Sequence, residues 1–208
     1  MCLLTLSLLR CQLPEPDGQD ISPNDTISIK DEPEPLPQLE PIPEPLPEPT
    51  VQQRVIAIAG GYVGVREVGK NTSPEIDRWL RSVNLRPGNP YCAAFVSYIL
   101  DSAHVSYPKI RSGLARNFVT NRSIPASRVM IGIEQIPEGS IVVWRRGNTI
   151  FGHAGFVTSW QGASGTTIEA NTSSGEQGSQ SDGDGVYRRT RTIIPSAHFR
   201  ITDFTVIE

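Results

Sequence analysis

The stretch 88-GNPYCAAFVSYILDSA-103 decides the fold, because it joins a turn signal to an apolar helical pattern. Asn89 and Pro90 indicate a turn, and residues 91–103 predict a helix. The face of this helix that we expect to be buried carries Cys92, Phe95, Val96, Ile99 and Leu100. Cys92 therefore falls in the first turn of a helix that packs against the rest of the domain.

Cys92 is a candidate nucleophile because of this position. Unpaired amide groups at a helix N-terminus carry partial positive charge, which favours the thiolate, and the thiolate is the reactive form of a cysteine. The chain has three cysteines, and the other two, Cys2 and Cys11, lie near the N-terminus, so no disulfide framework can hold the body together. The alternative is that Cys92 is only a small buried apolar side chain, which is the commoner role of a lone cysteine.

A nucleophilic thiol needs a base, and the sequence offers three histidines. His104 and His198 have no distinctive context, whereas His153 opens a predicted strand in the glycine-containing segment FGHAGFVTSW (151–160). Gly152 and Gly155 are predicted to leave room for a substrate backbone beside the imidazole. His153 is therefore the candidate base.

A base also needs an acceptor that fixes the orientation of its ring. The following strand, TIEANTS (167–173), contains Glu169 and Asn171. Residues two apart on a strand point to the same face, so the pattern puts Glu169 and Asn171 on one face and Ile168 and Ala170 on the other. The alternative is that the polar face is simply exposed to solvent.

The segments around this stretch predict an α+β domain. Helical patterns cover residues 51–68, with Gly60 and Gly61 as a weak point, and residues 73–83, and a short helix is predicted near residues 113–119. Strands are predicted over residues 140–145, 153–160, 165–171, 185–193 and 199–207. Helices followed by strands predict an antiparallel sheet of about five strands, with the N-terminal helices packed on it.

The first 50 residues differ in composition from the body at 51–208. They hold ten acidic and two basic residues, whereas the body holds twelve acidic and seventeen basic residues. Eleven of the eighteen prolines lie between residues 14 and 50, so we expect residues 13–50 to be a disordered, extended acidic linker. The mild positive charge of the body is interpreted as ordinary solvated surface, so no nucleic-acid partner is predicted.

The N-terminal segment is a weak export signal. Residues 1–12 are candidates for a signal or anchor segment, because MCLLTLSLLR is apolar, although it is short and lacks a leading basic residue. Cys11 is a candidate for lipid attachment, but Arg10 before it argues against this. We expect a secreted, periplasmic or cell-envelope protein, with a membrane or wall tether through the leader as one role for that segment.

Several segments of the body together resemble a CHAP domain, the cysteine, histidine-dependent amidohydrolase/peptidase branch of the NlpC/P60-like, papain-related superfamily. These are EVGKN (67–71), SPEIDRWLRSVNL (73–85), GNPYCAAFVSYIL (88–100), GHAGFVTSW (152–160), TIEANTS (167–173) and GVYRRTR (185–191). The resemblance covers about residues 52–207. It implies a papain-like fold and cleavage of amide bonds in bacterial peptidoglycan, either between N-acetylmuramic acid and L-alanine or within the stem peptide or cross-bridge.

The resemblance also implies roles for the candidate residues. Cys92 is the expected nucleophile, His153 the general base, Glu169 the orienting residue and Asn171 a further polar residue that orients the base or binds substrate. The implied reaction is acyl transfer through a thioester, with the Cys92 amide helping to hold the oxyanion. Tyr91 either walls the substrate groove or packs against the sheet.

No cofactor is predicted, and no metal site. Some members of the family bind calcium through aspartates near the nucleophile, but here the neighbours of Cys92 are Tyr91, Ala93 and Ala94. The segment SDGDG (181–185) is interpreted as a turn, and no zinc-binding pattern is present. We expect a monomer that acts as a wall-remodelling enzyme, a phage lysin or an antibacterial effector. The alternatives are an inactive wall-binding or scaffold protein with the same fold, and an enzyme for another amide.

Overall fold

The computed structural model describes residues 47–175 and 182–208. The predicted signal segment at 1–12, nearly all of the proline-rich linker at 13–50 and the first residue of the predicted turn at 181–185 lie outside the described residues. Within the described part of the chain, no helix has both the length and the apolar character needed to cross a membrane.

Three helices form the N-terminal part of the domain: α1 (Val51–Gly60), α2 (Pro74–Ser82) and α3 (Cys92–Ser102). α1 begins with a capping box between Thr50 and Gln53. It ends at Gly60, so the prediction of a helix to residue 68 is wrong. Two consecutive glycines lose more backbone entropy in a helix than other residues do, and here the helix stops at the first of them.

α2 and α3 follow the predicted pattern. Ser73 caps α2 by accepting a hydrogen bond from the Ile76 amide at 3.3 Å, and Pro74 occupies the first helical position, where its missing N–H costs nothing. Ile76, Trp79 and Leu80 then bury one face of the helix.

The sheet has six antiparallel strands in the order β1-β6-β2-β3-β4-β5. They are β1 (Ile124–Pro125), β2 (Ile141–Arg146), β3 (Gly152–Gln161), β4 (Ser164–Thr172), β5 (Gly185–Thr192) and β6 (Phe199–Thr205). The five predicted strands are all present, and the sixth is the two-residue β1 at the edge beside β6. A 3-10 helix, η1 (Ala115–Phe118), and a short helix, α4 (Ala126–Met130), complete the described elements. The fold is α+β, as predicted.

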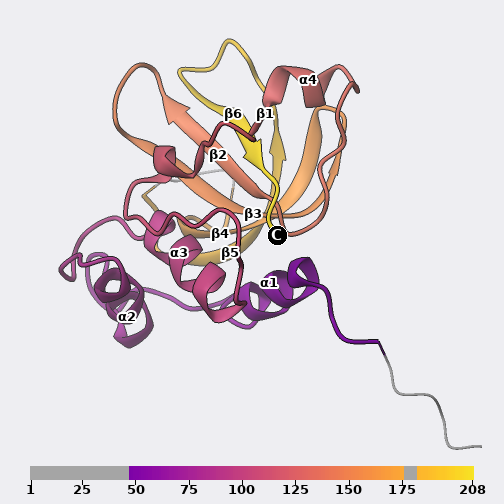
Figure 1. Ribbon diagram of the computed structural model, residues 1–208. Coiled ribbons are helices and arrows are strands. Elements are labelled where there is room, and N and C mark those ends of the chain that lie inside the picture. Colours follow the sequence, from indigo (N-terminus) through magenta and orange to yellow (C-terminus); the bar gives the residue numbers. More distant parts are fainter. Residues whose placement is uncertain (1–46, 176–181) are drawn as a thin grey trace, which may run out of the picture. The chain divides into compact units, whose positions relative to one another are not determined.

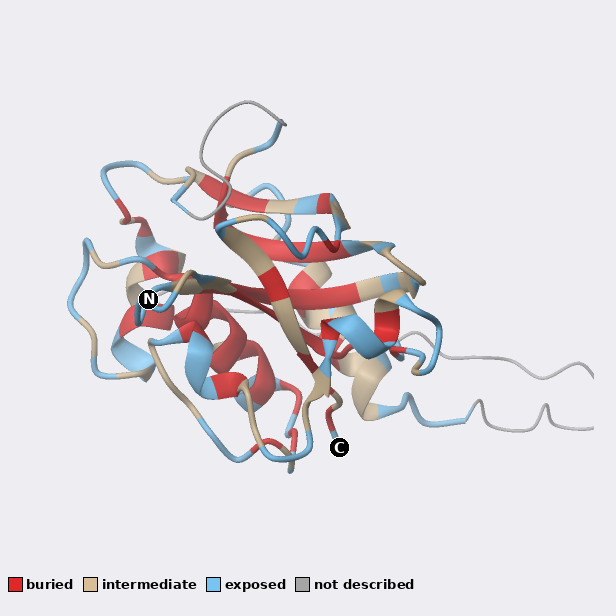
Figure 2. Cartoon of the chain, turned by 90° about the horizontal axis from the view of Figure 1, so that it is seen from above, coloured by how far each residue is buried: buried red, intermediate tan, exposed pale blue. Residues whose placement is uncertain are grey.

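The two faces of the sheet are covered by different elements. Figure 1 shows α1, α2 and α3 on one side of the sheet and α4 on the other. The larger core lies between the three helices and the sheet, where Phe95 of α3 meets Phe156 of β3 and Ile168 of β4. A smaller core on the opposite face contains Trp144 and Phe204. Burial accordingly runs along the central strands and on the helix surfaces that face them (Figure 2).

Candidate active site

Cys92 is the first residue of α3, at the end of the helix where backbone amides have no intrahelical partner. The N-cap residue is Tyr91, and no side chain caps this helix end. The Cys92 side chain is 6% exposed and is the only cysteine among the described residues. The sequence prediction of a thiol at a helix N-terminus is therefore matched by the structure.

A groove of about 270 Å³ leads to Cys92. Its lining consists of Leu85, Asn89, Pro90, Cys92, Gly113, Leu114, Ala115, Ile150, Phe151 and Gly152. None of these residues is charged. Leu114, Ile150 and Phe151 are large apolar side chains that are 44%, 54% and 62% exposed. Exposed apolar side chains gathered around one groove are typical of a surface that contacts a ligand.

His153 lies at the start of β3 and has no exposed surface. Its Nε2 is 2.8 Å from Oε2 of Glu169. An ionised carboxylate can only accept a hydrogen bond, so Nε2 carries the proton in this pair. The other ring nitrogen, Nδ1, is buried and has no nitrogen or oxygen partner within residues 47–175 and 182–208. Cys92 is near enough to the imidazole to raise its pKa, and because Nε2 is bonded to Glu169, Nδ1 is the nitrogen left to face the thiol.

The surroundings of His153 favour its charged form. Burial alone would lower the pKa of the imidazole, but the neighbouring Cys92 and Glu169 outweigh burial and raise the pKa to about 9. The ring of Trp144, the cross-strand neighbour on β2, lies 5.1 Å from the imidazole between centroids, and Phe199 lies at 6.5 Å. These aromatic rings help to keep water away from the imidazole.

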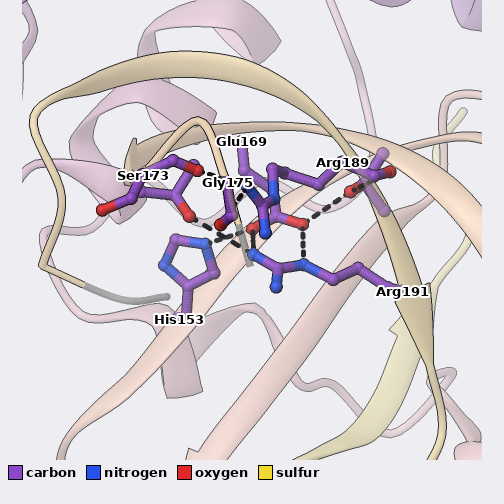
Figure 3. Close-up of polar contacts among 8 residues, drawn as sticks. His153, Glu169, Ser173, Gly175, Arg189 and Arg191 are labelled. Carbon is purple, nitrogen blue, oxygen red and sulfur yellow. Dashed lines mark hydrogen bonds and ion pairs between the residues drawn. The ribbon is translucent and has the colours of Figure 1, made fainter. Parts of the chain in front are cut away.

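Glu169 on β4 is fully buried, and its carboxylate is held by several donors (Figure 3). Nε of Arg191 donates to Oε1 at 2.7 Å, Nη2 of the same guanidinium donates to Oε2, and the Thr167 hydroxyl also donates to Oε1. Burial would raise the pKa of this carboxyl group, but the bonds to Arg191 and His153 lower it to about 2. Glu169 is therefore an anion at neutral pH. The alternative that this face of β4 is exposed to solvent is wrong.

Glu169 lies on the face of the sheet that points away from α1, α2 and α3. Ile168 and Ala170 pack with α1–α3, whereas Thr167 and Glu169 point to the other side of the sheet. Asn171, predicted to share the face of Glu169, lies at a break in the β4–β5 register and has a left-handed backbone with φ of 60°. The residue that hydrogen-bonds Nε2 of His153 is Glu169.

Asn171 and Tyr91 lie together beneath the site. Both are fully buried, and the backbone amide of Asn171 donates to the Tyr91 hydroxyl. The Tyr91 hydroxyl also lies 3.2 Å from a carboxylate oxygen of Glu67, and its ring packs on Trp79. Of the two roles predicted for Tyr91, the structure shows packing in the core, and the groove wall is made by Asn89 and Pro90 instead.

The two predicted glycines differ in position. Gly152 lines the groove, and a side chain there would clash with the backbone oxygen of Trp144 at 2.3 Å. Gly155 is buried and lies against Glu169: a Cβ atom would fall 2.6 Å from Glu169 Cγ and 2.8 Å from the Ile168 carbonyl oxygen. The missing side chain at Gly155 therefore makes room for the carboxylate, and the space beside the groove is provided at Gly152.

We expect Gly155→Ala to lower the free energy of unfolding by about 1–3 kcal/mol, because a backbone oxygen cannot move aside as a flexible side chain can. The displaced Glu169 should also weaken the hydrogen bond to His153. Urea unfolding of the purified chain measures the first effect. Gly60→Ala is the matched control, since its Cβ meets only the tip of Arg188 at 3.4 Å. Equal stability of the two variants would contradict the expected clash.

Three residues of the site were not singled out from the sequence: Arg191, Thr167 and Trp144. Arg191 and Thr167 hold Glu169, and Trp144 covers the imidazole. The alternation of GVYRRTR contained a signal, since an arginine two residues from another on a strand shares its face. The sequence could not show that this face carries the carboxylate. Among the described residues, no group of three or more His, Cys, Asp or Glu side chains is placed to hold a metal ion.

The fold and the site together define a thiol–imidazole–carboxylate arrangement on an α+β scaffold of the papain-like class: the thiol heads a helix, and the imidazole and carboxylate come from adjacent strands. Residues 84–171 match the family model of the CHAP domain, the family that the motifs predicted. The match is shorter than the resemblance over 52–207, and it includes Cys92, His153, Glu169 and Asn171 but not Arg191. It indicates an amidohydrolase or peptidase, with peptidoglycan hydrolysis as the general activity. Searches of curated proteins and of solved structures find no match.

Proposed function

We propose that this domain hydrolyses an amide bond of bacterial peptidoglycan, with Cys92 as nucleophile, His153 as general base and acid, and Glu169 as the residue that orients His153. The observation that carries the proposal is the arrangement at the end of the groove. Cys92 lines the groove, whereas the imidazole of His153 and the carboxylate of Glu169, which act on the thiol, are fully buried.

The reaction follows from these positions. Nδ1 of His153 takes the thiol proton of Cys92, and the resulting thiolate attacks the carbonyl carbon of the amide. The negative charge on the carbonyl oxygen is stabilised by donors at the start of α3, including the Cys92 backbone amide. The imidazolium then gives its proton to the leaving amine, which leaves a thioester on Cys92. Water, activated by the neutral imidazole, hydrolyses the thioester and regenerates the thiol.

Glu169 and Asn171 have different parts in this proposal. The Glu169 carboxylate accepts the Nε2–H bond, which fixes the tautomer with Nδ1 toward the thiol and stabilises the imidazolium. Asn171 supports the site through its backbone, because its amide donates to Tyr91, the residue that precedes the nucleophile.

The lining of the groove favours a substrate in which the groups on either side of the cleaved amide are uncharged. This lining is mainly apolar, and Asn89 is its one polar side chain besides the thiol. In a peptidoglycan stem, alanyl and lactyl groups fit such a lining better than the charged D-glutamyl and diamino acid groups, because an unpaired charge in an apolar groove loses its hydration. This supports the bond between muramic acid and L-alanine, or an alanyl bond of the cross-bridge.

We also propose that the protein acts outside the cytoplasm, at the cell envelope or after secretion, because peptidoglycan lies there. The proposed partner is the wall polymer alone, bound by a monomer, without nucleic acid. A wall-remodelling enzyme, a phage lysin and a secreted effector all fit this proposal.

Digestion of purified peptidoglycan followed by mass spectrometry of the products tests the proposal. Release of intact stem peptides from the glycan identifies an amidase, and shortened stems or opened cross-bridges identify an endopeptidase. Defined muropeptides in which alanine is replaced by glutamate next to the scissile bond should be cleaved more slowly. Binding to the wall without any new product would refute the hydrolase and support a scaffold.

A further inference from the structure

We propose that Arg191 is a positioning residue of this site: its guanidinium fixes the direction of the Glu169 carboxylate and balances its charge, so that Glu169 can hold the His153 imidazolium. This inference rests on the proposed function, because it gives Arg191 a part in the same reaction. Arg191 does not line the groove and would act only through Glu169.

The guanidinium engages both oxygens of the carboxylate. Nε donates to Oε1 at 2.7 Å and Nη2 donates to Oε2, a fork in which two planar groups meet (Figure 3). Oε2 is also the oxygen that accepts the Nε2–H bond of His153. A rotation of the carboxylate that broke the fork would therefore also misalign the bond to the imidazole. Bidentate pairs of this kind restrict geometry as well as adding energy.

The charge of Glu169 needs this partner because the carboxylate has no contact with water. Its side chain is 0% exposed, and that of Arg191 is only 12% exposed. An ionised carboxylate in such a place is strongly disfavoured unless opposite charges compensate it. His153 supplies compensation only while it is protonated, whereas an arginine stays charged throughout the pH range in which proteins are folded. Arg191 thus keeps Glu169 anionic in the step in which His153 has given up its proton.

The path of the Arg191 side chain supports a dedicated role. Arg191 pairs with Gly165 across β4 and β5, four residues from Glu169, so its side chain runs along the sheet to reach the carboxylate. Its Cζ lies 5.6 Å from the centre of the Trp144 ring, and the same ring lies 5.1 Å from the imidazole. The indole therefore adjoins both the guanidinium and the imidazole, and helps to exclude water from the pair.

Arg189 provides a matched control on the same strand. It lies two residues earlier, is 8% exposed, and donates to the backbone carbonyls of Ser173 and Gly175 (Figure 3). Arg189→Met removes a comparably buried arginine from β5. Any general loss of strand stability should therefore be common to Arg189→Met and Arg191→Met.

The test compares the full chain with Arg191→Met, Arg191→Lys and Arg189→Met. Carboxyl-labelled glutamate followed by NMR without substrate reports the ionisation of Glu169, assigned with Glu169→Gln. In Arg191→Met the pKa of Glu169 should rise by about one pH unit or more, as expected for loss of an adjacent guanidinium. The value of kcat should fall by about 10²-fold, within the range of general acid–base effects, while KM changes little. Arg191→Lys keeps the charge but loses the fork, so we expect a smaller pKa rise and an intermediate kcat.

The outcomes separate this inference from the proposed function. Glu169 titrating in Arg191→Met as in wild type would overturn the inference, and so would equal losses of kcat in Arg191→Met and Arg189→Met. Wild-type kcat in Arg191→Lys would overturn the positioning claim, and this variant decides the matter if Arg191→Met does not fold. A shifted Glu169 pKa in a chain that never cleaves peptidoglycan would support the coupling and refute the proposed function.

Discussion

Replacement of Cys92 by alanine is expected to abolish peptidoglycan hydrolysis, with a loss of about 10⁴-fold or more in kcat, as is found when a covalent nucleophile is removed. The remaining residues can still bind and polarise the amide, but no atom is left in the groove to form the thioester. The fold should persist, because the small side chain lies among Tyr91, Ala93 and Ala94, and an alanine occupies almost the same space.

Clearing of purified wall in a zymogram and the release of soluble muropeptides measure this effect. The control is the chain with Cys2→Ala and Cys11→Ala, which leaves Cys92 as the only cysteine and should keep full activity. Alkylation of that control by a small thiol reagent should abolish activity as Cys92→Ala does. If Cys92→Ala clears the wall as fast as wild type does, Cys92 is not the nucleophile.

Glu169→Gln is expected to have the second largest effect, on both activity and stability. A glutamine keeps the shape of the side chain but removes the charge, so Arg191 and His153 lose the group that neutralises them. Breaking a buried ion pair on one side typically lowers the free energy of unfolding by about 3–5 kcal/mol. Loss of the carboxylate behind a catalytic imidazole lowers kcat by about 10⁴-fold where it has been measured on a comparable triad.

The pH dependence gives this variant its own signature. In wild type the pKa of His153 is raised to about 9, so the imidazolium persists through neutral pH and the rate should fall as the pH rises through about 9. Glu169 is one of the groups that raise this pKa. In Glu169→Gln the remaining effects are burial, which lowers the pKa, and Cys92, so the alkaline fall should begin at a lower pH.

The same pKa values predict how stability depends on pH. The folded pKa of His153 lies above its ordinary value of 6.5, so its stabilisation is complete below pH 6.5 and is lost as the pH rises through about 9. The folded pKa of Glu169 lies below its ordinary value of 4.5, so its stabilisation is complete above pH 4.5 and is lost as the pH falls toward 2. Glu169→Gln should flatten the acid side of this profile.

Rate profiles from pH 5 to 10 and urea unfolding from pH 2 to 10 measure these changes. Glu67→Gln is the matched control, because Glu67 contacts the Tyr91 hydroxyl rather than the imidazole. An unchanged alkaline limb in Glu169→Gln, or the same loss of kcat in Glu67→Gln, would contradict the assigned role of Glu169.

Local sequence patterns predicted the parts of the site that depend on nearby residues. The apolar periodicity of residues 91–103 placed Cys92 at the start of a helix, and α3 begins at that residue. Strand alternation separated Ile168 and Ala170 from Glu169, which the two faces of β4 confirm. Both patterns arise from backbone geometry over a few residues, so the sequence contains them directly.

The contacts that the sequence did not reveal depend on how neighbouring strands are paired and on breaks in that pairing. Arg191 reaches Glu169 from a strand position paired with Gly165, an offset that only the β4–β5 register defines. The register break near Asn171 ends the simple alternation that predicted a shared face with Glu169. Gly155 of β3 lies directly beside Glu169 on the neighbouring strand β4. Only glycine fits there, and this follows from contacts between strands that local sequence does not define.

The complete burial of His153 limits how its proton can travel. Nε2 is occupied by Glu169, and the ring offers no surface to bulk solvent, so exchange must take place at Nδ1, through the sulfur of Cys92 or a group bound in the groove. The proton that Nδ1 takes from the thiol therefore stays on the imidazole until it is transferred to the leaving amine. The proton taken from the thiol therefore leaves with the amine in the first half of the reaction, and the proton that regenerates the thiol in the second half comes from the water that hydrolyses the thioester.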